Sequence, residues 1–322
     1  MPRPKRIVCL GGGNAMPQAV LAGLKKCPDV ELSVISAMLD SGGSAGKERK
    51  ELFHTKISFG DIRRASYALS ENPEKDKFNT RISFGRYRGH VISNLTCSTI
   101  IKETNDYEKA IDYLNDEIFK IPKKHKVLPS TLDEADVYAE LENGKIIGGE
   151  AKIDIPKEQE RPRIKQVYLK PKAKAYPKTL EAIRKADLIV IGPGDLYSSL
   201  AQILLVEGIP EALRESRAKK VYLVNLMTKN GETNNFSVLD FVNEIEKYLE
   251  GSLDYVIYNN FLPSKEKIKE TIKENPLLLD LVKINEDLAG EKFIGENLLS
   301  DSGLVVHNPQ KLAKIILKLC KP

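Results

Sequence analysis

The sequence predicts an α/β fold, a Rossmann-like three-layer αβα sandwich on a mostly parallel sheet. Short runs of β-branched and other apolar residues alternate with amphipathic segments of helix length, and glycine-rich turns follow three of the runs. Runs that are apolar throughout are typical of parallel strands buried on both faces. The predicted strands are RIVCL (6–10), VELSVISAM (30–38), LIVIG (188–192), KVYLVNLM (220–227) and YVIYN (255–259).

The chain is predicted to form a single domain, residues 1–322, with an antiparallel β-hairpin insertion around 122–172. Its 322 residues, 41% of them hydrophobic, suffice for one large α/β domain or two smaller ones, and one is the simplest account. Two alternating runs flank Asn143-Gly144, a strong hairpin signal. The lysine- and proline-rich segment 154–179 is expected to continue the insertion at the surface.

Two helices are predicted after residue 260, in the segments PSKEKIKETIKENPLLLDLVK (263–283) and NPQKLAKIILKLCK (308–321). In the second, apolar residues recur at helical spacing, so this helix should cover the sheet. These residues are Leu312, Ile315, Ile316 and Leu319.

Composition narrows the class of protein. The net charge of +5 is spread along the chain rather than clustered, which argues against a nucleic-acid partner. The four cysteines lie far apart, without the spacing of a zinc site or a disulfide framework. The sequence has no signal-peptide pattern and no long apolar stretch, so we expect a cytoplasmic protein without a membrane span. Its oligomeric state stays open, and a homodimer or higher homo-oligomer is one alternative.

Three consecutive glycines follow the first predicted strand and precede an amphipathic helix. Backbone N–H groups and the positive end of a helix dipole favour a phosphate there, and glycine lets the backbone approach it closely. The motif is neither GxGxxG nor a Walker A loop, so a structural turn is an equal alternative. The candidate ligand-binding residues are Gly11, Gly12, Gly13 and Asn14.

A second glycine-rich loop, LDSGGSAG (39–46), follows the second predicted strand. Its aspartate lies at the strand's C-terminal end, where open α/β sheets place ligand contacts. A flexible surface loop is the alternative. However, two such loops after consecutive strands can line one crevice, which favours a phosphate or nucleotide site. The candidates are Asp40, which is also the metal ligand if any metal binds, Gly42, Gly43 and Ser44.

Polar residues in further segments are candidates for the same crevice. Asp61 could bind a ribose, a metal or an acceptor hydroxyl, or could instead N-cap its helix. If the protein is an enzyme, Asp40 and Asp61 are the catalytic candidates. The segment 229–233 is either an active-site flap or an exposed turn. The other candidates are guanidinium, amide, hydroxyl and turn residues, namely Arg63, Asn94, Gly192, Gly194, Asp195, Tyr197, Asn225 and Thr228.

Several of these motifs occur together and in order in one known family. GPGDLYSSLAQILLVEGIPEAL followed by KVYLVNLMTKNGET, after LDSGGSAGKERKEL, GDIRRA and GHVISNL, resembles the gluconeogenesis factor branch of the 2-phospho-L-lactate transferase superfamily. The resemblance spans essentially the whole chain. It implies a Rossmann-like sheet whose strand-end loops hold a nucleotide or nucleotide sugar.

The resemblance implies two alternative functions. Proteins of the gluconeogenesis factor branch bind UDP-sugars such as UDP-N-acetylglucosamine and support cell-wall synthesis and cell shape. Proteins of the transferase branch use a divalent metal, Mg²⁺ being the expected ion, to move a phospholactyl group from a guanosine diphosphodiester to a deazaflavin alcohol. A scaffold that binds a partner protein through the lysine-rich surface is a third alternative.

The chain departs from the pattern of the branch at three places. Asn14 and Ala15 replace a Thr-Gly pair, and Ser41 replaces the second of two aspartates, which weakens the case for a bound Mg²⁺. Val306 replaces an arginine near the C-terminus. If that arginine neutralises a diphosphate, its absence costs about 1.5–3 kcal/mol of binding free energy.

Overall fold

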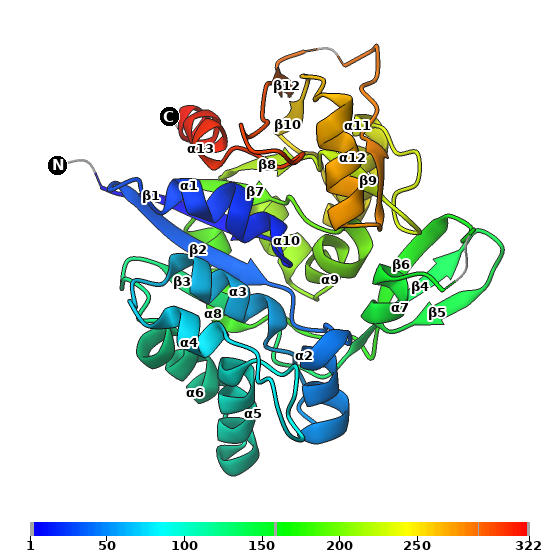
Figure 1. The fold of residues 1–322 in the computed structure, drawn as a ribbon. Coiled ribbons are helices and arrows are strands. Elements are labelled where there is room, and N and C mark those ends of the chain that lie inside the picture. Colours follow the sequence, from blue (N-terminus) through cyan, green and yellow to red (C-terminus); the bar gives the residue numbers. More distant parts are fainter. Residues whose placement is uncertain (1–2, 158–159, 289, 321–322) are drawn as a thin grey trace.

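Seven parallel strands form the central sheet of the protein, in the order β12-β10-β8-β7-β1-β2-β3 (Figure 1). The structure is a computed structural model that describes residues 3–157, 160–288 and 290–320. Helices cover both faces of the sheet, which confirms the predicted α/β sandwich. The strands are β1 (Lys5–Leu10), β2 (Val30–Ser36), β3 (Lys126–Pro129), β7 (Leu188–Ile191), β8 (Lys219–Leu223), β10 (Tyr255–Asn259) and β12 (Phe293–Glu296).

The central strands are apolar on both sides because each face carries its own core. In β1, Val8 and Leu10 pack into one core while Ile7 and Cys9 pack into the other. Successive side chains of a strand point to opposite faces, so a strand covered by helices on both sides must be apolar at every position. This requirement explains why RIVCL and LIVIG are readable as strands from sequence alone.

Two groups of helices cover the sheet and hold these cores. One face is covered by η1 (Pro17–Leu21), α1 (Ala22–Leu24), α3 (Gly60–Leu69), α5 (Ile92–Thr104), α6 (Tyr107–Asp112), η3 (Tyr113–Ile118) and α13 (Pro309–Leu319). The other face is covered by α8 (Pro177–Arg184), η4 (Leu196–Leu200), α9 (Ala201–Leu204), α10 (Ile209–Glu215) and α11 (Val238–Leu249). Outside these two groups and the insertion, the described helices are α2 (Gly43–Lys47), η2 (Glu48–Leu52), α4 (Lys75–Asn79) and α12 (Lys265–Glu274).

The insertion is a separate three-stranded antiparallel sheet to the right of the central sheet in Figure 1. As predicted, Asn143-Gly144 makes its hairpin turn, where the Gly144 N–H donates to the Leu141 carbonyl at 2.9 Å. The predicted insertion around 122–172 starts too early, because β3 belongs to the parallel sheet. Segment 154–179 also contains a strand with buried Val167 and Leu169 rather than only surface chain. The insertion comprises β4 (Asp136–Leu141), β5 (Ile146–Gly148), α7 (Glu150–Asp154) and β6 (Ile164–Lys170).

The C-terminal predictions were partly wrong. The helix predicted over 263–283 ends after Glu274, and β11 (Leu278–Leu281) instead pairs antiparallel with β9 (Met227–Lys229). Pro276 explains the end, because proline disfavours helical backbone at the residue before it. The strand predicted over 220–227 is likewise split between β8 and β9. By contrast, α13 lies on the sheet as predicted, with Leu312 and Ile316 buried.

Two expectations about covalent and membrane structure can be compared with the described residues. All four cysteines lie among them and are free. None of the helices in this part of the chain combines the length and apolarity that a membrane crossing needs.

A close approach between α1 and α13 depends on Gly23. A Cβ at this position would lie 2.1 Å from the Pro309 carbonyl oxygen. We therefore expect Gly23→Ala to lower the free energy of unfolding by about 1–3 kcal/mol, because α13 must move to admit the methyl group. Urea unfolding of Gly303→Ala is the control, since a Cβ on Gly303 meets open space. Equal stability of the two variants would contradict this packing.

Candidate functional site

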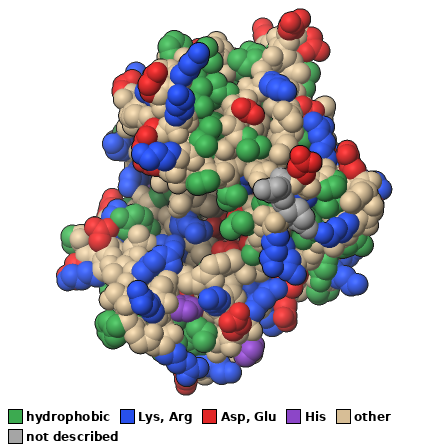
Figure 2. All heavy atoms as spheres, turned by 45° about the vertical axis from the view of Figure 1, so that its right-hand side comes forward, with side chains coloured by type: hydrophobic (Ala, Val, Ile, Leu, Met, Phe, Trp, Pro, Cys, Tyr) green, Lys and Arg blue, Asp and Glu red, His purple; other side chains and the backbone are tan. Residues whose placement is uncertain are grey.

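A cleft with two adjoining lobes lies at the C-terminal ends of β1 and β7. The first lobe has a volume of about 350 Å³ and the second about 370 Å³. Gly13, Asn14 and Asp195 line both lobes and mark their junction. The space-filling view shows a hollow in one face of the molecule with both acidic and basic side chains in it (Figure 2). This is the edge at which open α/β sheets bind their ligands.

The first lobe is strongly charged. The loop after β2, α3 and the short helix α7 of the insertion converge on it, together with the turn after β7. Three guanidinium groups line it, those of Arg63, Arg64 and Arg81. Five carboxyl groups also line it, those of Asp40, Asp61, Glu150, Asp154 and Asp195.

The second lobe is mostly uncharged. Among the described residues that line it, Asp195 at the junction is the one carboxylate. Burial lowers the pKa of His307 to about 4, so its ring is neutral at pH 7, and its Nε2 has no hydrogen-bond partner among the described residues. Apolar residues form much of the wall, namely Ala15, Ala19, Pro193, Leu226, Met227, Leu278, Val305 and Val306.

The glycine loop after β1 holds a carboxylate. The Gly13 N–H donates to Asp61 Oδ1 at 2.9 Å, and Arg64 donates to the same oxygen at 2.7 Å. A Cβ on Gly12 would lie 2.2 Å from Asp61 Oδ2, so glycine is required for this approach. Asp61 is therefore no N-cap, because Phe59 occupies that position of α3. Burial raises the pKa of Asp61, although Arg64 and the Gly13 N–H oppose the effect.

Asp40 is paired with a carboxyl group that the sequence did not single out. Glu150 in α7 accepts the Ser41 N–H at 3.2 Å, and the Ala151 N–H donates to Ser41 Oγ at 3.0 Å, so α7 is docked on the 39–46 loop. Burial, then repulsion by Asp40 and Asp154, raises the pKa of Glu150 to about 10. Glu150 and Asp40 share a side-chain hydrogen bond, and the raised pKa of Glu150 favours the proton that this bond requires.

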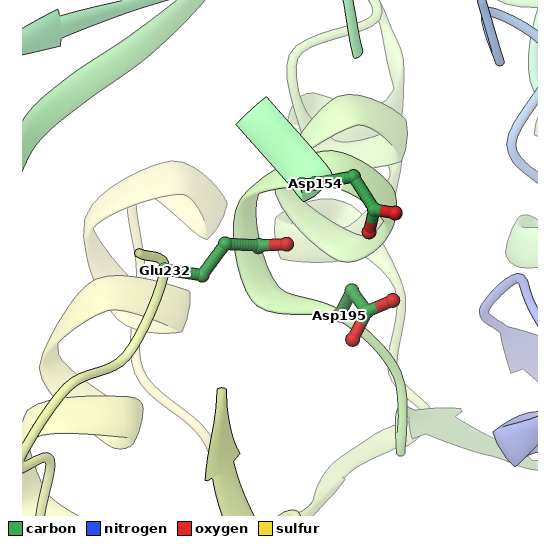
Figure 3. Close-up of side chains that lie close together, drawn as sticks. All are labelled: Asp154, Asp195 and Glu232. Carbon is green, nitrogen blue, oxygen red and sulfur yellow. The ribbon is translucent and has the colours of Figure 1, made fainter. Parts of the chain in front are cut away.

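Three carboxylates meet at one wall of the cleft, where Asp154, Asp195 and Glu232 point toward one another (Figure 3). One oxygen of each lies within 4.8 Å of the others, a spacing that suits a metal ion. The Lys229 ammonium fills this position instead. It lies 3.0 Å from Asp195 Oδ2 and 3.2 Å from Glu232 Oε1, and it also bonds Asp154.

The charges of this cluster explain its protonation. Burial alone would lower the pKa of Lys229, but attraction by Glu232, Asp195 and Asp154 outweighs burial and raises it. Burial raises the pKa of Glu232 and of Asp195, while Lys229 acts to lower both. The segment 229–233 is therefore neither a flap nor an exposed turn, because Lys229 and Glu232 are buried.

A divalent cation fits the acidic cluster poorly as it stands. The Lys229 ammonium already lies among the three carboxylates, and a cation at that position would have to displace it. The sequence predicted no metal, or Asp40 as its ligand if one binds. The structure adds Glu150 as a second carboxyl group beside Asp40.

Most of the predicted site residues lie around the cleft. The polar groups of Asn225 are already used, because its amide donates to the Gly194 carbonyl at 2.9 Å and accepts the Gly194 N–H at 3.1 Å. The predicted residues that line one or both lobes are Gly12, Gly13, Asn14, Asp40, Gly42, Gly43, Ser44, Asp61, Arg63, Asn94, Gly194, Asp195 and Asn225.

Four predicted residues line neither lobe and have structural contacts. A Cβ on Gly11 would lie 2.9 Å from the Cβ of Met16. Gly192 has a φ of +75°, and a Cβ there would lie 3.0 Å from the Leu223 carbonyl oxygen. Tyr197 is buried, and its N–H donates to Glu232 at 2.9 Å. The Thr228 hydroxyl bonds the backbone of Asp280 and so ties β9 to β11.

Comparison with known proteins identifies the family. The family model of 2-phospho-L-lactate transferase CofD matches residues 7–297. The chain belongs to the CofD family.

Relatives of this CofD family member match it from end to end. A putative gluconeogenesis factor from Thermotoga maritima is 34% identical, with 98% of this chain and 99% of the relative covered. The gluconeogenesis factor of Listeria monocytogenes is 35% identical, with 98% and 95% covered. A crystal structure of a UPF0052 family member from Bacillus halodurans superposes with a TM-score of 0.88 at 33% identity, with 98% of this chain and all of that chain covered.

The lysine at the centre of the acidic cluster should be essential to the stability of this CofD family member. We expect Lys229→Met to lower the free energy of unfolding by about 3–5 kcal/mol, because three buried or half-buried carboxylates lose their counter-charge. Chemical unfolding measures this loss, and Lys174→Met, which removes an exposed lysine, is the control.

The stability loss of Lys229→Met should also depend on pH. The pKa values of Asp195 and Glu232 are raised in the folded state, so the folded protein gains protons before the unfolded chain as the pH falls. We therefore expect the deficit of Lys229→Met to be larger at pH ~8 than at pH ~5. A deficit that does not change with pH would argue against uncompensated carboxylates as its cause.

Proposed function

We propose that this CofD family member binds a nucleotide sugar such as UDP-N-acetylglucosamine and acts as a regulatory protein that supports cell-wall precursor metabolism and cell shape. The observation that carries the proposal is the chemical contrast between the two lobes. A charged lobe and a mostly apolar, uncharged lobe meet at Gly13 and Asn14, at the carboxyl ends of parallel strands. A nucleotide sugar has corresponding parts, with a flat base at one end, a polar sugar at the other and a diphosphate between them.

The contrast favours one orientation of the ligand. The base suits the second lobe, where apolar side chains and the neutral His307 ring lie. The sugar suits the first lobe, because carboxylates such as Asp40 and Asp195 accept hydrogen bonds from sugar hydroxyls. The diphosphate then lies at the junction beside Asn14, and not on the Gly13 N–H, which Asp61 already occupies.

Unpaired polar atoms at the cleft support a ligand in both lobes. Asn94 is buried in the wall of the first lobe, and its Oδ1 has no partner among the described residues. His307 Nε2 is in the same situation in the second lobe. A buried polar group without a partner costs about 1–3 kcal/mol, which a ligand that supplies the missing hydrogen bond recovers.

The names of the relatives and the lysine in the acidic cluster both favour a regulatory role over catalysis. The relatives carry the name gluconeogenesis factor, and none of those compared above is named as an enzyme. The acidic cluster that would suit a catalytic metal is filled by Lys229.

A transferase is the second candidate function. The family model carries the name 2-phospho-L-lactate transferase, and Asp40 and Asp61 both line the first lobe, where they could position an acceptor alcohol. Incubation with a guanosine diphosphodiester donor, a deazaflavin alcohol and Mg²⁺ tests it. Formation of the coupled product supports the transferase, and its absence at all concentrations argues against it.

The nucleotide-sugar proposal predicts a large ligand-induced stabilisation. UDP-N-acetylglucosamine at roughly 100 times its Kd should raise the free energy of unfolding by about 2.7 kcal/mol. Asn14→Asp, which changes no shape but adds a negative charge at the junction, should weaken binding about tenfold, equivalent to about 1.4 kcal/mol. Thermal shift and calorimetric titration measure both effects.

An isosteric control separates this effect from a general change of charge. Asn297→Asp adds the same charge at an exposed position that lines neither lobe, and it should bind like the wild type. If the wild type binds no UDP-sugar, the proposal is wrong. If Asn14→Asp and Asn297→Asp bind equally well, the diphosphate does not lie at the junction.

A further inference from the structure

A cationic groove lies next to the cleft, between η1–α1 on one side and α3–α4 on the other. It has a volume of about 470 Å³. None of the described residues that line it is Asp or Glu. Five cationic side chains line the groove. Three of them, from α3 and the chain after α4, also line the first lobe, and the other two come from the C-terminal end of α1 and from α4. The five are Lys25, Arg63, Arg64, Lys75 and Arg81.

Arg63 is the buried centre of the cationic groove. Its side chain is only 6% exposed, and its Nε has no hydrogen-bond partner among the described residues. Its Nη1 bonds Asn79 Oδ1, another residue of the groove. A buried guanidinium with an unused donor beside a cavity lacks the acceptor that its chemistry requires.

The carboxylates near Arg63 are committed elsewhere. Asp61 accepts from Arg64 at 2.7 Å and from the Gly13 N–H. Glu48 is bonded to the His90 ring at 2.7 Å. Burial, followed by repulsion from Arg64 and Arg81, therefore lowers the pKa of Arg63 to about 10. Arg64 thus has the Asp61 carboxylate as its ion-pair partner, whereas neither Arg63 nor Arg81 forms an ion pair among the described residues.

The two lysines at the other side of the groove are half-buried and donate to backbone carbonyls of α3, but they too have no carboxylate partner in the described part of the chain. Lys25 Nζ donates to the Ala68 carbonyl at 2.5 Å, and burial and then Lys75 and Lys26 lower its pKa. Lys75 Nζ lies 4.7 Å from the centre of the Tyr67 ring. Neither lysine forms an ion pair with a residue in the described part of the chain.

We propose that this groove binds the phosphoryl group of a small phosphorylated metabolite as a second ligand, distinct from the nucleotide sugar of the cleft. Guanidinium forks match phosphate oxygens, and lysines add point charges around them. The volume suits a small molecule rather than a protein or nucleic-acid strand. The Tyr67 ring offers an apolar surface to the body of that molecule.

Calorimetric titration with inorganic pyrophosphate tests the proposal. The variant Lys25→Gln/Lys75→Gln removes two cations of the groove and leaves the cleft untouched. We expect its Kd for pyrophosphate to rise about 100-fold, roughly tenfold for each charged hydrogen bond lost. Lys26→Gln/Lys102→Gln removes two exposed lysines outside the groove and is the matched control, with a Kd within about threefold of the wild type.

The same titration distinguishes the groove from the cleft. With UDP-N-acetylglucosamine present in excess, pyrophosphate should still bind the wild type, and its Kd for the groove variant should still be about 100-fold higher. Circular dichroism confirms that both double variants are folded. Equal affinity of the two double variants would overturn the proposal. So would the absence of pyrophosphate binding by the wild type at millimolar concentration, or binding that the nucleotide sugar displaces and the groove variant retains.

Discussion

The buried ammonium of Lys229 is the interaction on which the cleft depends. It joins carboxylates from three separate parts of the chain: α7 in the insertion, the turn after β7, and the turn after β9. Glu232 in turn accepts the N–H groups of Tyr197 and Ser198 and so fixes the start of η4. Without this positive charge the three carboxylates would repel one another, and the contact between α7 and the turns after β7 and β9 would weaken. The insertion is thus held at the site by this cation as well as by the hydrogen bonds of α7 with Ser41.

The glycine loop after β1 shows why a motif does not define its own ligand. The Gly13 N–H donates to an anion, and the missing Cβ of Gly12 lets that anion approach, as in a phosphate site. Here, however, the anion is the side chain of Asp61. Arg64 balances that carboxylate from the same helix. The region around Gly13 therefore offers less positive potential to a ligand than a free helix N-terminus would. The positive charge that remains in the first lobe is that of Arg63 and Arg81.

The parts of the fold that sequence could predict are those with local causes. Central strands buried on both faces are apolar at each position, and Asn143-Gly144 makes a turn in any context that allows one. Edge strands such as β3 and β12 are only four residues long. Most residues of β12 are also half-exposed, so its sequence cannot be distinguished from that of a loop. The site is harder still, because Glu150 lies 109 residues from its backbone partner Ser41 and Lys229 lies 75 residues from Asp154. No local pattern encodes such contacts.

Arg63 couples the cleft to the cationic groove, because its guanidinium lines both. An anion in the groove would offset the charge of Arg63, Arg64 and Arg81 and so change the potential in the first lobe. The first lobe carries more carboxyl groups than guanidinium groups, so these arginines are needed there when the groove is empty. By thermodynamic linkage, any effect of one ligand on the affinity of the other must be reciprocal. Because the first lobe and the groove share these three arginines, a ligand in one changes the potential in the other, whereas Lys25 and Lys75 line the groove alone and keep its ligand distinct from that of the cleft.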